Sequence, residues 1–102
     1  MAYNIVQSSP IVRGVNSITF SVSSALTVGN VVLLEILSEG ASPNAIPGFA
    51  LQAADTQGNT SSASRWARTI KSGDPQILTV NLNSPSVGFG LELSGYTALG
   101  GG

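Results

Sequence analysis

Few residues of this chain can carry out chemistry, because it contains no histidine and no cysteine. The commonest general base, a thiolate nucleophile and a cysteine-ligated zinc site are therefore excluded. The only lysine, Lys71, lies beside a Gly-Asp-Pro turn, where we expect it to be solvated rather than paired with a catalytic serine. The nine charged residues are Arg13, Arg65, Arg68, Lys71, Glu35, Glu39, Asp55, Asp74 and Glu92.

Glu35 and Glu92 are the candidates for a pair of catalytic carboxylates, because each interrupts an apolar run. Such a pair, as in glycoside hydrolases, needs both acids in one cleft. We favour the alternative that each acid pairs with an arginine, such as Arg65 or Arg68, or points outward, since a buried carboxylate has to be paired. No catalytic residue is expected, and the chain is predicted not to be an enzyme.

Two other groups of side chains could bind a ligand. Asp55, followed by Gln57 and Asn59, offers oxygen ligands. Ca²⁺ usually takes more than one carboxylate, so a solvated loop is the better interpretation, and neither a metal nor a cofactor is expected. The second group is Arg65, Trp66 and Arg68, which could form a platform for a sugar or a base. A lone tryptophan in a small sandwich more often fills the core, and that interpretation is favoured.

The elements that must position these residues are predicted to be β-strands, and the segment 31–37 is the clearest. It follows a Gly-Asn turn, is short, and is apolar at both strand parities. A strand of this kind is covered on both sides. One side would meet the core, and the other a loop of the chain itself or a neighbouring subunit. The two faces carry Val31, Leu33 and Leu37, and Val32, Leu34 and Ile36.

Period-two alternation predicts further strands, and residues rich in Gly, Pro, Ser and Asn predict the loops between them. The strands are expected near residues 15–22, 49–54, 64–71, 78–82 and 87–93, with loops at 40–48 and 55–62. No segment has a helical pattern. The fold class is therefore all-β, a single small β-sandwich or jelly roll of about seven or eight antiparallel strands.

The domain is expected to fill residues 1–102, with 1–10 a possible N-terminal arm and 96–102 a glycine-rich C-terminal tail. In the strand 87–93 the apolar residues are expected to face the core. Gly88 and Gly90 would then lie on the outer face, where glycine permits another backbone to approach closely. The residues predicted to contact partners are Tyr3, Ile5, Val6, Gly88, Gly90, Tyr96 and Leu99.

The composition narrows the range of partners. Charged residues make up 9% of the chain, against roughly 25% in an average soluble domain. A net charge of −1 with only four cations gives no footprint for nucleic acid. No apolar run reaches membrane-spanning length, and no signal peptide is expected at the N-terminus. So low a charge count favours a surface covered by other subunits; the alternative is a surface that is polar but uncharged.

Several stretches resemble small jelly-roll domains of tailed-bacteriophage virion proteins and bacterial surface proteins. The resemblance spans about residues 15 to 97 and consists of strand and turn residues rather than a catalytic signature. Its pieces are Ile18-Thr19-Phe20, Val28 to Leu34, Pro47-Gly48-Phe49, Trp66-Ala67-Arg68, Gly73-Asp74-Pro75, Leu78-Thr79-Val80 and Leu93-Ser94-Gly95-Tyr96.

A free-standing domain of this size is most similar to the capsid decoration, or cement, proteins within that group. The resemblance implies a structural protein made in the host cytoplasm and located in the virion, on the outer capsid surface. Its partners would be the major capsid protein and its own copies, as a homotrimer, without nucleic acid or membrane. The alternative is a glycan- or receptor-binding module of a tail fibre or surface protein, using Arg65, Trp66 and Arg68 with the loops around Asn44 and Asn59.

Overall fold

The computed structural model describes residues 3–57 and 61–99, which form eight β-strands and no α-helix. In chain order the strands are β1 (Asn4–Ser8), β2 (Val12–Gly14), β3 (Ser17–Ser21), β4 (Val31–Ser38), β5 (Ala50–Gln57), β6 (Ser61–Thr69), β7 (Ile77–Asn81) and β8 (Ser86–Ser94). Every pair of neighbouring strands is antiparallel. The predicted all-β class with seven or eight strands is confirmed.

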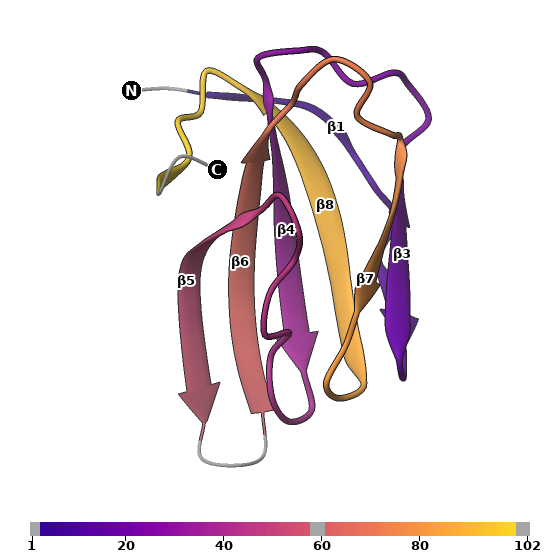
Figure 1. Ribbon diagram of the computed structural model, residues 1–102, viewed down its shortest axis with the longest axis vertical. Helices are drawn as coiled ribbons and strands as arrows, with labels where there is room; N and C mark the ends of the chain where they lie inside the picture. Colours follow the sequence, from indigo (N-terminus) through magenta and orange to yellow (C-terminus); the bar gives the residue numbers. More distant parts are fainter. Residues whose placement is uncertain (1–2, 58–60, 100–102) are drawn as a thin grey trace.

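The strands form two unequal sheets that pack against each other (Figure 1). The large sheet has the order β1-β8-β4-β6-β5, and β2 pairs with the other half of β8, so β1 and β2 together form one edge. The small sheet contains only β3 and β7. The large sheet therefore has an inner face toward the small sheet and an outer face on the opposite side.

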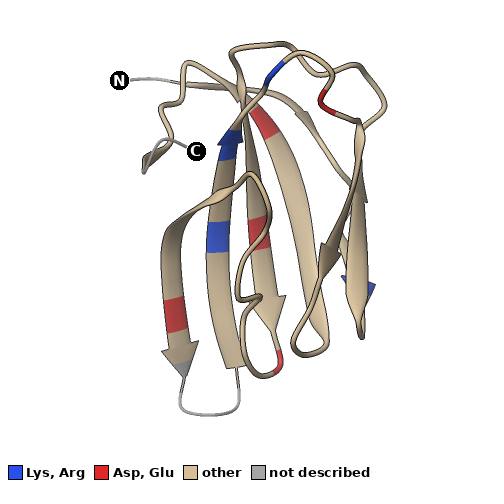
Figure 2. Ribbon diagram, viewed as in Figure 1, with Lys and Arg blue, Asp and Glu red and all other residues tan. Residues whose placement is uncertain are grey.

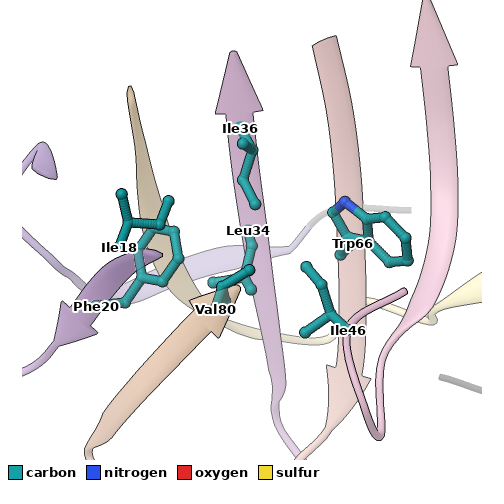
Figure 3. Packing of buried hydrophobic residues seen from close by; sticks show 7 residues of the cluster. All are labelled: Ile18, Phe20, Leu34, Ile36, Ile46, Trp66 and Val80. Carbon is teal, nitrogen blue, oxygen red and sulfur yellow. The ribbon is translucent and has the colours of Figure 1, made fainter. Parts of the chain in front are cut away.

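The central strand β4 is buried on both faces at its start. On the inner face, Leu34 and Ile36 join a core with residues of the small sheet and of β6. Figure 3 shows this cluster between the sheets, with Ile46 lying over Trp66. Its members are Ile18, Phe20, Leu34, Ile36, Ile46, Trp66 and Val80.

The outer face of β4 is covered in part by the chain's own C-terminal segment. Val31 and Leu33 pack with Ala67 and Leu93 into a second cluster, against which Tyr96 and Ala98 rest. The segment reaches the far edge of the sheet, where the backbone of Leu99 exchanges two hydrogen bonds with the side chain of Gln52. Of the two predicted covers, a loop of the same chain is therefore the one present at this end of β4.

The N-terminal segment is a strand rather than a free arm from Asn4 onward. β1 pairs with β8, joining Asn4 to Ser94 and Ser8 to Leu91, with an irregularity between Ile5 and Gln7. Residues 1–2 and 100–102 of the predicted arm and tail lie outside the described part of the chain. One edge of β1 is therefore already paired with β8 of the same chain.

The parity predicted for β8 is wrong. Gly88 and Gly90 are buried on the inner face, and a Cβ atom added to Gly88 would lie 2.4 Å from the carbonyl oxygen of Glu35 and 3.4 Å from Cζ of Phe20. Phe89 and Leu91 lie on the outer face, half-buried. The backbone that approaches these glycines is that of β4 in the same chain, and the ring of Phe20 fills the space above Gly88.

The predicted loop 55–62 is shorter than expected. β5 continues through Asp55 and Thr56, and β6 already begins at Ser61. Thr56 pairs with Ser62, so ladder hydrogen bonds between the two strands outweigh the turn preference of these polar residues. Residues 58–60, including Asn59, lie outside the described residues.

Candidate functional site

The predicted ligand platform is not assembled. Trp66 is only 5% exposed and lies in the inner core, where its Nε1 donates a 2.9 Å hydrogen bond to Oγ of Ser64. Arg68 shares the inner face with Trp66, whereas Arg65 pairs with Glu35 on the outer face. The three side chains therefore present no common surface on which a sugar could stack.

Glu35 and Glu92 do not face one cleft. Glu35 is on the outer face and forms an ion pair with Arg65, as the favoured alternative predicted. Glu92 is on the inner face and 1% exposed, and its partners are neutral. The amides of Gln7 and Asn30 and the backbone N–H of Thr27 donate hydrogen bonds of 2.8, 2.9 and 3.1 Å to its carboxylate.

These donors keep Glu92 ionised. Burial alone would raise the pKa of its carboxyl, but the hydrogen bonds from Gln7, Asn30 and Thr27 outweigh burial and lower the pKa below the ordinary value. The pairing of Glu92 with an arginine is therefore a wrong prediction. A carboxylate that is fully engaged by donors from its own chain is an anchor for those segments rather than a general acid.

A cavity of about 410 Å³ lies between the two sheets, near the start of β4. Its size is within the range of small-molecule sites, and its walls are mostly apolar. The apolar lining includes Phe20, Val22, Leu26, Val32, Leu34, Phe49 and Leu78, and polar groups of Ser9, Arg68, Asp74, Gln76 and Glu92 border it.

The strongest polar group beside this cavity is an internal ion pair. Arg68 donates from Nε and Nη2 to the two carboxylate oxygens of Asp74, both at 2.9 Å, and from Nη1 to the carbonyl of Gly48 at 3.2 Å. The hydrogen bond from Arg68 lowers the pKa of Asp74, and that from Asp74 raises the pKa of Arg68. Because both charges are compensated within the ion pair, the mostly apolar cavity can hold an apolar group.

The outer face of the large sheet is open at the end away from the C-terminal segment. Leu37, in the central strand β4, is 60% exposed there. A second hollow, of about 500 Å³, borders it and is lined in part by Arg13, Glu39 and Val87. Figure 2 shows that acidic and basic positions are spread over the described ribbon without a region of a single sign.

The residues predicted to contact partners are divided between surface and core. Tyr3, Ile5, Val6 and Leu99 are exposed, and Tyr96 is half-buried. The rings of Tyr3 and Tyr96 meet edge to face with centroids 5.6 Å apart, which joins the two ends of the described chain. Ile5 pairs with Leu93, so it shares the outer face with Tyr96. Gly88 and Gly90 are buried and cannot contact another protein.

No protein-family model matches this chain, and no curated protein and no solved structure matches it. Within residues 3–57 and 61–99 there is no group of three acidic side chains that could hold a metal ion. The same part of the chain has no helical segment with the length and apolarity needed to cross a membrane.

The cavity was not predicted from the sequence, and the outer face was predicted only as a second apolar side of the strand 31–37. The cavity is lined by residues from Ser9 to Glu92, which are adjacent only once both sheets are formed. The alternation in β8 did contain a signal for the outer face, since Val87, Phe89 and Leu91 share one parity. That signal was assigned to the core.

Proposed function

We propose that this chain is a non-enzymatic structural protein of a virion, a decoration or cement protein that stabilises a bacteriophage head by binding between capsomers. It would act on the outer capsid surface, with the major capsid protein and its own copies as partners. The virion context comes from the resemblance of its strand and turn segments to small phage jelly-roll proteins. The resemblance also implies a homotrimer.

One observation supports an assembly role above the others: exposed apolar side chains on a molecule with very few charges. Ile5 is 61% exposed, and Tyr3, Val6 and Leu99 are also exposed near the two ends of the described chain. Surface patches of this kind mark protein contacts in soluble proteins. We call these four residues the terminal surface and propose that it binds the shell. Many weak copies acting together would stabilise the capsid by avidity.

A sedimentation experiment with point variants tests this function. Deleting the N-terminal segment would remove β1 from the sheet, so exposed side chains are changed instead. Ile5→Ser combined with Leu99→Ser is expected to leave the fold intact and to abolish co-sedimentation with undecorated capsids of the phage that encodes the chain.

Val15→Ser is a matched control, because Val15 is similarly exposed and lies outside the terminal surface. This control is expected to bind capsids as the unchanged protein does. An unchanged protein that fails to sediment with capsids would overturn the decoration function. Binding that survives the double substitution would overturn the terminal surface as its site.

A further inference from the structure

A single row of side chains crosses the open end of the outer face. In the register of the sheet, Asp55 pairs with Ala63, Ala63 with Leu37, Leu37 with Val87, and Val87 with Arg13. Directly paired residues of antiparallel strands place their side chains on the same face. We call these five residues the Leu37 row. It carries an acid at one edge, a base at the other and three apolar residues between them.

The Leu37 row is accessible over its whole length. Arg13, Leu37 and Asp55 are exposed, and Ala63 and Val87 are half-buried. In the described chain, residues 3–57 and 61–99, Arg13 forms no ion pair. Leu37 is an exposed leucine in the central strand, and its neighbours in the row on both sides are apolar. Together they form a continuous apolar strip rather than a scattered surface residue.

We propose that the Leu37 row is the contact surface for a second copy of this chain, packed face to face about a two-fold axis parallel to β4. Leu37 would then meet Leu37 of the second copy at the centre. A two-fold contact of this kind uses the same patch on both subunits. This contact goes beyond the proposed function and differs from the homotrimer that the resemblance implies, because a two-fold contact joins two copies rather than three. The protein alone is measured, so capsid binding is judged separately.

The charges at the two ends of the row select this axis. Neighbouring strands lie about 4.8 Å apart, so Asp55 and Arg13 are separated by about 19 Å, with Leu37 midway. Rotation about an axis parallel to β4 exchanges the two edges, which places Arg13 of each copy over Asp55 of the other. Rotation about an in-plane axis along the row would instead place Arg13 over Arg13. Opposite charges therefore favour the first arrangement, and like charges disfavour the second.

The adjacent row is compatible with the same axis. There, Glu35 occupies β4 and is paired with Arg65 on β6, so the charges at the axis cancel within each copy. Phe89, on the other side of Glu35, would face Arg65 of the second copy. A guanidinium over an aromatic ring is a favourable contact. The same axis brings the C-terminal segments of both copies to one end, so the two sheets lie closest, about 10 Å apart, at the Leu37 row and diverge toward the covered end.

The first test is the molar mass of the purified full chain, measured by sedimentation equilibrium over a range of concentrations. We expect a dimer for the unchanged protein. Leu37→Lys is expected to weaken the dimer at least about tenfold, because it puts two cations at the centre of the contact. Ile77→Lys is the matched control: Ile77 is 62% exposed, lies in β7 of the small sheet and should leave the dimer unchanged.

A charge exchange tests the orientation. Arg13→Asp alone and Asp55→Arg alone each create two like-charge contacts per dimer and should weaken it. The double variant restores opposite charges in reversed order, so its dimer should return toward the strength of the unchanged protein. Circular dichroism checks that every variant is folded.

Three results would overturn the proposal. The first is an unchanged protein that stays monomeric up to about 1 mM, where even weak contacts are populated. The second is a dimer or a trimer that Leu37→Lys leaves intact, since another surface would then hold it. The third is a double charge variant that dimerises no better than either single variant, which would exclude the two-fold arrangement parallel to β4.

Discussion

Glu92 is a buried acid whose negative charge is stabilised only by hydrogen bonds from neutral donors. Its carboxylate accepts hydrogen bonds from β1, through Gln7, and from the segment before β4, through Thr27 and Asn30. Two segments far apart in sequence are thereby fixed to one residue of β8. The sequence identified Glu92 as unusual, because it interrupts an apolar strand, but its partners depended on which loop closes over that end of the sheet.

The Glu92→Gln variant tests this anchor. One carboxylate oxygen would become an amide NH₂ facing a donor, so we expect the free energy of unfolding at pH 7 to fall by about 1–3 kcal/mol. The folded protein lowers the pKa of Glu92, so it binds fewer protons than the unfolded chain as the pH falls. The stability from Glu92 is therefore present above the ordinary pKa of 4.5 and is lost as the pH drops through the lowered pKa.

Urea unfolding at several pH values between about 7 and 3 measures both effects. The acid-induced loss of stability should be smaller in Glu92→Gln than in the unchanged protein, although Asp74, whose pKa is also lowered, still contributes. Glu39→Gln serves as a control, because Glu39 is exposed. An equally steep pH dependence in Glu92→Gln and in the unchanged protein would contradict the role given to this carboxylate.

Gly88 is required by space rather than by backbone conformation. Its missing Cβ would lie within 2.4 Å of a backbone oxygen, which cannot move aside without shifting β4. Gly88→Ala is therefore expected to lower the free energy of unfolding by about 1–3 kcal/mol, as overpacking does. Gly40→Ala is the matched control, because the nearest atom to its Cβ is a serine side-chain carbon at 3.4 Å. Thermal unfolding of both variants provides the measurement, and equal losses would refute the steric account.

At the scale of elements, β4 was the easiest strand to predict and β8 the hardest to orient. Apolar residues at both parities of β4 predicted a cover on each side. The inner cover is the small sheet, and the outer cover, the C-terminal segment, reaches only the start of the strand. In β8 one parity carries large apolar residues and the other carries glycines, a pattern that normally places the large residues inside. The inner face of β8 does not follow this rule, because the ring of Phe20 from the small sheet fills the space over Gly88. Little room is left there for a larger side chain of β8. The sequence of β8 alone contains no information on what lies opposite.

The C-terminal segment was predicted from the sequence only as a glycine-rich tail. A chain that ends at Gly95 would expose Val31, Leu33 and Leu93 on the outer face, since Tyr96 and Ala98 cover them. We expect the free energy of unfolding to fall by roughly 2–4 kcal/mol, from the apolar area returned to water. Chemical denaturation measures this loss.

A chain ending at Leu99 separates the contribution of residues 96–99 from that of the residues after them. We expect the chain ending at Leu99 to be more stable than the chain ending at Gly95 by that same amount. A chain ending at Gly95 that is as stable as one ending at Leu99 would show that the outer cover contributes no stability.

At the scale of the whole molecule, few charges and an open sheet face point to association. If folded chains pair through the Leu37 row and unfolded chains do not, the melting temperature must depend on protein concentration. For a domain of this length the expected rise is roughly 3 °C for each tenfold increase in concentration. Calorimetry over that range measures it. At concentrations where only the unchanged protein is dimeric, the melting temperature of Leu37→Lys should not change with concentration. A melting temperature of the unchanged protein that is independent of concentration would argue against pairing.

The fold could be predicted further than the site for a physical reason. Strand periodicity and turn residues are local properties, and they predicted the fold class and most of the strands. A contact surface depends on the register in which strands pair. Arg13, Leu37 and Asp55 lie in one row only after five strands have paired. The absence of histidine and cysteine can also be read from the sequence, and it limits the possible catalytic groups without any knowledge of the structure.

The edge-to-face contact between Tyr3 and Tyr96 has a practical consequence for engineering. Because it holds Tyr3 against the start of the C-terminal segment, a linker could join the two ends of the described chain, and new termini could be opened elsewhere, as in a circular permutant. Tyr3 and Leu99, the ends of the described chain, also lie at the covered end of the outer face, away from the Leu37 row. A fused tag or cargo protein would then be carried away from that row, so the chain could display a payload without blocking its own pairing.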